Sequence, residues 1–402
     1  MPDPLFVQVL AATTKETREQ MLSLGTARQI YSNNIRSTLI GKQDNRLRLK
    51  AKPANRHKYG SVVDALRSLV HRGWVLEALD LSRVRLSADE LRNLTPILMQ
   101  CRSMTDLNMT GNAQGRQGVT ALVAPLRTVL CQSLLSLDVS HNALDTFTAP
   151  VLARGLAQCS ALTSLSLQNN QLDTHGARIV MAALQRGPAT VLQRLGLENI
   201  GLTAQNAADL ARLVRQCPAL TSLCLNENSL GDDSASVVLE ALQQGPATAL
   251  QELELTAIYL SPEGTADLAR AMTMWPALER LSAPGNSIQS EGAKYLAAAL
   301  PQCPSLTDLN IRDNYIGNLG ATDIAKAMRS CTRLCVLELG ENTISDDGFH
   351  AMLAGAAGCP SLEELYLEHN LISDEATADA VFPDHVYVDC SDQGENLDDE
   401  DA

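Results

Sequence analysis

Apolar residues recur along this chain at fixed offsets. The clearest copy is Leu306–Ile316, LTDLNIRDNYI, with leucine or isoleucine at the first, fourth, sixth and eleventh positions and asparagine at the ninth. Eleven copies follow one another at spacings of 28 or 30 residues. They begin at Leu76, Met104, Leu134, Leu162, Leu192, Leu220, Leu250, Leu278, Leu306, Leu334 and Leu362. Such a period predicts a stacked array of repeats rather than independent globular domains.

Each copy predicts a strand, a turn and a helix. In residues 162–172, LTSLSLQNNQL, leucines alternate with polar residues at the period of a β-strand. The following HGARIVMAALQRG has the apolar spacing of an amphipathic helix and ends at Gly-Pro, where proline cannot continue a helix. Because helices are wider than the ~4.8 Å spacing of strands, the stack must curve, with its parallel strands on the inner face.

These residues resemble the leucine-rich-repeat family, specifically its long-repeat, ribonuclease-inhibitor-like branch, over about residues 76–385. The resemblance implies an α/β fold, a right-handed solenoid (horseshoe) with parallel strands on the concave face and helices on the convex face. It also implies protein binding through the concave strands and the loops after them, although one solenoid serves many partners. We expect a basic N-terminal extension and cap (1–75), eleven repeats (76–372), a C-terminal cap (373–388) and an acidic disordered tail (389–402).

Two recurring residue types receive structural interpretations. The ninth position is asparagine in eight copies, where its amide can satisfy backbone groups of the turn. Val84, Ile200 and Ile258 replace it elsewhere, and we interpret the two isoleucine copies as a second repeat type with an apolar turn. Seven of the ten cysteines stand three residues before a repeat start, where a small buried thiol suffices.

Composition narrows the classes of function. The net charge of −14 argues against a general nucleic-acid binder, and 3% aromatic residues is low for a protein that packs small planar ligands. No small-molecule substrate is evident. No stretch approaches the ~20 apolar residues of a membrane span. Reduced cysteines favour a cytoplasmic protein, with association to the cytoskeleton, cilia or nuclear envelope left open.

A basic run precedes the repeats. Residues 28–58 hold nine lysines or arginines and one acid, Asp44. The candidate anchor residues in this basic arm are Arg46, Arg48, Lys50, Lys52, Arg56 and Lys58. Such a run is commonly a solvated arm; alternatively, it binds an acidic partner or assembly. Leu47 and Leu49 within it have the spacing of a degenerate repeat that would cap the open end of the core.

The candidate binding surface consists of the polar residues between the inward-facing strand leucines. Two such columns, at the fifth and seventh positions, are polar and mildly acidic. The candidate partner-binding residues are Asp80, Asp138, Glu198, Glu254, Arg312, Glu338, Tyr366 and Glu368. Aromatic and arginine anchors are few here, so we expect a wide polar surface for a protein with a basic surface rather than a deep pocket.

No motif indicates catalysis. The chain has no phosphate-cradling glycine loop, no HExxH and no paired Cys-x-x-Cys, and its seven histidines share no motif with a candidate nucleophile. We therefore expect a scaffold with no catalytic residues, no metal and no cofactor.

A weaker resemblance supplies the alternative function. Ran GTPase-activating proteins are similar horseshoes with an acidic tail, an essential Gly-Arg in an early loop and an asparagine pair two repeats later. Here TGNAQGRQG would supply Arg116, and LQNNQL would supply Asn169 and Asn170. The resemblance implies that these loop residues contact Ran and its nucleotide site. The shorter acidic tail and the long basic arm depart from that family's pattern.

Overall fold

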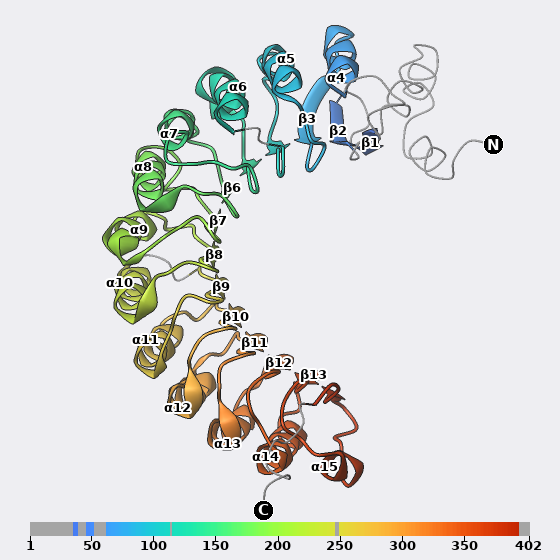
Figure 1. Cartoon of the computed structure of the whole chain (residues 1–402), viewed down its shortest axis with the longest axis vertical. Coiled ribbons are helices and arrows are strands. Elements are labelled where there is room, and N and C mark those ends of the chain that lie inside the picture. Colours follow the sequence, from blue (N-terminus) through green and yellow to red (C-terminus); the bar gives the residue numbers. More distant parts are fainter. Residues whose placement is uncertain (1–34, 39–45, 52–61, 113–114, 246–248, 394–402) are drawn as a thin grey trace, which may run out of the picture. The chain divides into compact units, whose positions relative to one another are not determined.

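The computed structural model describes residues 35–38, 46–51, 62–112, 115–245 and 249–393. Two compact units divide the chain, unit 1 up to Gly196 and unit 2 from Leu197. In each unit short strands lie on one side and helices on the other, in the order strand, turn, helix (Figure 1). The predicted α/β solenoid is therefore confirmed within each unit.

Unit 1 opens with two strands and a helix that precede the first repeat. These are β1 (Ile35–Thr38), β2 (Arg46–Ala51) and α4 (Val62–His71). The repeats supply β3 (Val75–Asp80), α5 (Ala88–Leu98), β4 (Asp106–Asn108), α6 (Gly115–Thr128), β5 (Ser136–Asp138), α7 (Ala149–Leu156), β6 (Ser164–Ser166), α8 (Asp173–Arg186) and β7 (Arg194–Gly196), with a 3-10 turn at Leu130–Gln132. β1 is antiparallel to β2, and all later pairs up to β7 are parallel.

Unit 2 continues the same order. Its elements are α9 (Ala207–Val214), β8 (Ser222–Cys224), α10 (Gly231–Gln244), β9 (Glu252–Glu254), α11 (Pro262–Met272), β10 (Arg280–Ser282), α12 (Gln289–Ala299), β11 (Asp308–Asn310), α13 (Gly317–Met328), β12 (Val336–Glu338), α14 (Asp346–Ala357), β13 (Glu364–Tyr366), α15 (Asp374–Ala378) and β14 (Tyr387–Asp389), with 3-10 turns at Ala204–Asn206 and Leu300–Gln302. Strands β8 to β14 pair in parallel, each with its neighbours in sequence.

The core is a set of apolar columns in register. Leu309 pairs with Leu281 on one side and Leu337 on the other, so equivalent leucines stack across neighbouring strands. Leu306, Leu309, Ile311 and Ile316 of one repeat are all at most 3% exposed. The strand side of the core is thus formed by the predicted first, fourth, sixth and eleventh positions. The helices are amphipathic: their apolar residues cover the other side of the core, and their polar faces remain in water.

A ladder of buried asparagines links neighbouring repeats. Nδ2 of Asn342 donates to the carbonyls of Ile311, Leu339 and Gly340, at 2.9, 3.1 and 3.1 Å. Its backbone N–H donates to Oδ1 of Asn370 in the next repeat at 2.9 Å. The asparagines at this position, all at most 4% exposed, are Asn112, Asn142, Asn170, Asn228, Asn286, Asn314, Asn342 and Asn370. The predicted structural role of these amides is confirmed.

The turn has a second regular feature, which the sequence pattern does not show. The eighth residue of every repeat has a positive φ, in the left-handed region that disfavours L residues. Its occupants are Arg83, Gly111, His141, Asn169, Asn199, Glu227, Ala257, Gly285, Asp313, Glu341 and His369. Only two of them are glycine, so the fold imposes this conformation on almost any residue.

Seven of the ten cysteines are buried, and Cys331, Cys335 and Cys390 are partly exposed. All ten lie in the described part of the chain, and no disulfide joins any two of them there. Sγ of Cys101 and of Cys217 donates to the carbonyl four residues earlier, of Ile97 and Leu213, at 3.2 Å in both cases. Burial raises the pKa of both thiols to about 12, so they stay protonated and unreactive near neutral pH.

The C-terminal coil continues past the predicted cap. β14 includes Asp389, so the boundary expected at residue 389 falls inside a strand. Oε1 of Gln393 accepts the backbone N–H groups of Asn370 and Ile372, at 3.0 and 3.3 Å. Gln393 thus takes the place of the next asparagine in the ladder. The rest of the predicted acidic tail, 394–402, lies outside the described residues.

Candidate interaction surface on the strands and following loops

The predicted partner-binding residues occupy the strand face that points away from the helices. Neighbouring residues of a strand point to opposite sides, and the fourth and sixth positions face the core. The fifth and seventh positions therefore face outward. All eight candidates are half-buried there, packed against their neighbours on adjacent strands.

In unit 1 the two predicted acids also stabilise their own strands. Oδ1 of Asp80 accepts the backbone N–H of Ser82 at 2.9 Å, and Oδ1 of Asp138 accepts that of Ser140 at 2.9 Å. Such a bond from a side chain to the backbone two residues later is a local turn interaction. These carboxylates therefore have a structural role beside the predicted one.

In unit 2 the acids connect neighbouring strands. Oε2 of Glu254 accepts Nδ2 of Asn226 at 2.9 Å. Oε2 of Glu198 lies 3.9 Å from the thiol of Cys224, whose pKa burial raises to about 12. Asparagine and thiol thus present donors to the acids, and this part of the surface is internally hydrogen-bonded.

Arg312 is held by two acids of the following repeats. Its guanidinium forms ion pairs with Glu341, where Nε lies 3.0 Å from Oε1, and with Glu368. The Arg312 side chain is 30% exposed. Its charge is thus largely matched within the unit, and the predicted contact of Arg312 with a partner stays a prediction. Oε2 of Glu368 is buried without a hydrogen-bond partner in the described structure.

Glu338 lies in the most acidic part of this face. Nδ2 of Asn310 donates to its Oε2 at 2.5 Å. Burial raises the pKa of Glu338 above the usual range of a glutamate, and the nearby charges of Asp308 and Glu364 raise it further, while Arg312 lowers it. The carboxylate therefore prefers to gain a proton or a cation.

Tyr366 lies beside the same acids. Its hydroxyl donates to Oε2 of Glu364 at 2.8 Å, and this bond is the main reason that the pKa of Tyr366 is raised. Its ring meets that of Tyr387 edge-on, with centroids 6.2 Å apart. The outward third, fifth and seventh positions of unit 2 hold seven acids and two arginines, so this face is net negative. The acids are Glu198, Glu252, Glu254, Asp308, Glu338, Glu364 and Glu368, and the arginines are Arg280 and Arg312.

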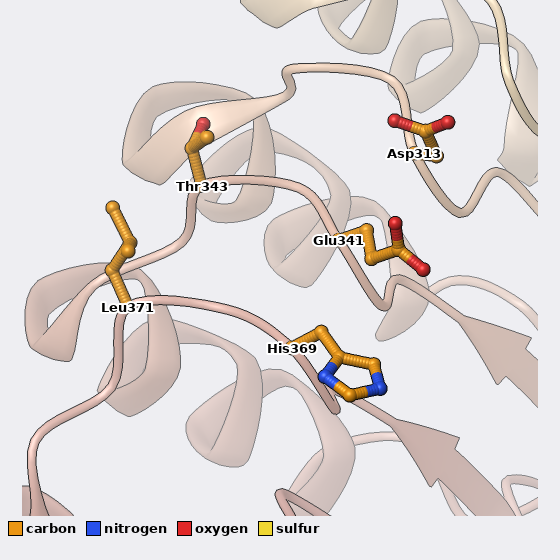
Figure 2. Close-up of a pocket in the computed structure, with 5 residues that line it drawn as sticks. All are labelled: Asp313, Glu341, Thr343, His369 and Leu371. Carbon is orange, nitrogen blue, oxygen red and sulfur yellow. The ribbon is translucent and has the colours of Figure 1, made fainter. Parts of the chain in front are cut away.

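An open hollow lies beyond the strand ends of the last three repeats. It has a volume of about 460 Å³ and is lined by Asp313, Glu341, Thr343, His369 and Leu371. Figure 2 shows Asp313, Glu341 and His369 in one row on consecutive loops, with Thr343 and Leu371 in a second row. The first row is the eighth position of the repeat and the second is the tenth.

The other predicted site residues are separate from this face of unit 2. Arg46, Arg48 and Lys50 belong to β2, which pairs with β3 and so is part of the sheet rather than a free arm. Lys52, Arg56 and Lys58 lie outside the described residues.

The residues of the Ran-activating alternative are not grouped as loop residues. Arg116 lies in the first turn of α6, although the sequence analysis placed it in a loop. Asn170 is buried, and its amide donates to Val139, Leu167 and Gln168. Asn169 occupies the left-handed eighth position. Asn170 therefore serves the turn and is not available to a nucleotide, and the alternative gains no support.

Sequence reasoning missed the row formed by Asp313, Glu341 and His369. The eighth position was as readable as the fifth and seventh, since all three recur every 28 residues in this part of the chain. The sequence predicted binding by the strands and the loops after them, but the candidate residues were all taken from the columns between strand leucines.

None of the helices that the structure describes has the length and apolar character needed to cross a bilayer. No three histidine, cysteine, aspartate or glutamate side chains in the described ranges are grouped so as to hold a metal ion.

Comparison with known proteins gives consistent relatives. The family model described as "Leucine Rich repeat" matches residues 130–146 and 302–325. NACHT, LRR and PYD domains-containing protein 3 of Rattus norvegicus is 29% identical over 221 residues, which are 55% of this chain and 21% of that protein. Ribonuclease inhibitor of Mus musculus is 27% identical over 229 residues, which are 57% of this chain and 50% of the inhibitor.

An internalin structure from Listeria monocytogenes aligns with a TM-score of 0.46 and 16% identity, over 78% of this chain and 83% of the internalin. The chain thus spans about a fifth of the NACHT, LRR and PYD domains-containing protein and half of the ribonuclease inhibitor. The repeats, the matched family model and the similarity to ribonuclease inhibitor support a leucine-rich-repeat protein of the ribonuclease-inhibitor-like, long-repeat branch.

Proposed function

We propose that the chain is a non-catalytic scaffold that binds a protein partner with a basic surface through the strands of unit 2 and the loops after them. The observation that carries this proposal is the open strand face, where seven acids accompany two arginines. Parallel sheets are normally covered on both faces. Here the second face is polar instead, and its charge attracts a cationic surface and disfavours an anionic one.

Site-specific photo-crosslinking in cells tests the location of binding. A photoreactive residue at Ser222 or Ser282 on the strand face should capture a protein. The control positions are Arg270 and Lys326 on the helices, whose side chains are each 70% exposed. Equal capture from the helix positions would contradict binding through the strands.

Charge reversal tests the chemistry of the same face. Glu254→Lys, Glu338→Lys and Glu368→Lys together should abolish capture of that protein, while the circular dichroism spectrum stays unchanged. Undiminished capture by the folded triple variant would overturn the predicted preference for a basic surface.

The basic run is a second part of the proposal. Arg48 is in register with Ala78 and Lys50 with Asp80, which are outward positions of β3. We propose that this run binds an acidic partner, of the kind found in cytoskeletal or ciliary assemblies. Leu49 of the same strand is 3% exposed, so deleting the run would remove part of the core. The test is therefore substitution: Arg48→Gln with Lys50→Gln should reduce retention on immobilised polyglutamate, and unchanged retention would exclude these two residues.

A further inference from the structure

The hollow beyond β11, β12 and β13 presents hydrogen-bond acceptors to an incoming group. Nδ1 of His369 lies 2.9 Å from the carbonyl oxygen of Asp392. A carbonyl can only accept, so Nδ1 carries the proton of the neutral ring and Nε2 is left as an acceptor. The hydroxyl of Thr343 donates to the carbonyl of Asn342 at 2.6 Å, so its remaining capacity is also as an acceptor.

The two carboxylates add negative charge to these acceptors. Arg312 contacts Oε1 of Glu341, which leaves Oε2 for another donor. The half-buried Asp313 side chain makes no hydrogen bond or ion pair with any residue that the structure describes. Every polar group lining the hollow thus has an acceptor that can take a donor, and two of the four groups are acids. An anionic or acceptor-rich ligand is excluded on this chemistry.

Two exposed apolar side chains follow Asp313 in the same repeat. Tyr315 precedes α13 and is 60% exposed, and Leu319 in the first turn of α13 is 75% exposed. Leu371 lines the hollow itself, at the tenth position that Tyr315 occupies in its own repeat. Tyrosine is enriched among the strongest contacts of protein interfaces. The surface therefore combines a cation-seeking hollow with a neighbouring apolar contact.

We propose that this hollow receives an arginine side chain from an extended segment of a protein partner, with an adjacent apolar side chain of the segment packed on Tyr315 and Leu319. A guanidinium is planar and carries five donors, so it can meet Asp313, Glu341 and Nε2 of His369 together. An ammonium has three donors and no fork geometry. The inference rests on the proposed function and deepens it, by assigning the partner's chemistry to a particular place.

The probe is a labelled peptide, Gly-Leu-Arg-Leu-Gly, compared with the same peptide carrying citrulline, which keeps the shape of arginine without its charge. Fluorescence polarisation with the full chain should show the arginine peptide binding about tenfold more tightly, as expected for one charge-assisted contact. In the folded double variant Asp313→Asn, Glu341→Gln this preference should disappear. The matched control, Asp89→Asn on α5 of unit 1, whose side chain is 81% exposed, should keep it.

Two outcomes would overturn the inference. One is equal affinity of the wild-type chain for both peptides. The other is a preference that persists in the double variant, which would place the contact elsewhere. Tyr315→Ala should weaken both peptides equally, since it removes only the apolar contact. The crosslinking from Ser222 and Ser282 is read independently, so strand capture without peptide discrimination would leave the proposed function standing and reject the hollow.

Discussion

The loops that follow the strands differ sharply between the two units. In the first repeat of unit 1 the eighth and tenth positions are Arg83 and Arg85. The described loops of unit 1 have no acid, phenylalanine, tyrosine or tryptophan at these positions. In unit 2 they carry three acids, Glu227, Asp313 and Glu341, and two tyrosines, Tyr259 and Tyr315, that are 70% and 60% exposed. Lysine and arginine are absent from these positions among the described residues of unit 2.

The backbone at the eighth position is nevertheless the same in both units. Arg83 has a φ of 57° and Glu341 a φ of 56°. The comparison shows that the repeat fixes the turn geometry, whereas it does not fix the residue type at this position. Specificity for a partner can therefore change here at little cost in stability.

Substitutions at the neighbouring residues Asp313 and Asn314 should differ most in their effect on the free energy of unfolding. Asn314→Ala removes an amide that donates to the carbonyls of Ala283, Ile311 and Arg312 at 2.8–3.1 Å. Each buried group left without a partner costs about 1–3 kcal/mol, so we expect a loss of about 3–5 kcal/mol in the free energy of unfolding. Asp313→Asn, which suits the left-handed region equally well, should change it by less than about 0.5 kcal/mol. Urea denaturation measures both; similar losses would remove the distinction.

A substitution at Gln393 sharpens the comparison at the end of the array. Gln393→Ala should cost about 1–2 kcal/mol, because two backbone N–H groups lose their acceptor where water can partly replace it. We expect amide hydrogen exchange to become faster at Asn370 and Ile372 and to stay unchanged in unit 1. Unchanged exchange at these amides would mean that the last coil does not depend on this side chain.

Opposite substitutions at the eighth residues of two consecutive repeats test whether both repeats have the same left-handed backbone there. Gly285 has a φ of 65°, and an added Cβ would meet Ala257 at an ordinary 3.7 Å, so Gly285→Ala should cost about 1 kcal/mol from backbone strain alone. Ala257, with a φ of 51°, should become about 0.5 kcal/mol more stable as Ala257→Gly. Thermal unfolding reports both; the same sign for the two changes would contradict a common left-handed turn.

The smallest expected effect concerns the acids of the strand face. The folded state binds a proton at Glu338 more tightly than the unfolded state, because folding raises the pKa of this side chain. The resulting stabilisation of the folded state is present below the ordinary pKa of glutamate, and it is lost as the pH rises through the raised pKa of Glu338. Glu338→Gln should therefore melt at a slightly higher temperature than the wild type at pH 7, and the difference should vanish near pH 4. A constant difference across this range would assign it to something other than titration.

Much of the framework could be predicted from spacing alone. The core leucines and the ladder asparagines were predictable because burial restricts each to one residue class, which repeats along the chain. Gln393 was not predictable in this way. It lies 23 residues after Asn370 and so departs from the repeat spacing, and its residue type differs as well.

The candidate site was less predictable, for two physical reasons. The positive φ of Ala257 or Glu341 is imposed by tertiary structure, since neither residue type prefers it. The ion pairs of Arg312 depend on how far a long side chain reaches, over one repeat to Glu341 and two to Glu368. The position of a residue in the repeat predicts which face of the sheet it lies on, but not which side chains it contacts. The ion pairs of Arg312 were therefore not predicted.

The asparagine ladder also determines how unit 2 should carry mechanical load. Each amide fastens its coil to the one before it, and each N–H fastens it to the one after, as at Asn314 and Asn342. Ile258 has no amide with which to make the backward link. Ile200 lacks this amide as well. Tension along the solenoid would thus be borne evenly from Asn286 to Gln393, and the coils of Ile200 and Ile258 would be the weaker ones in unit 2.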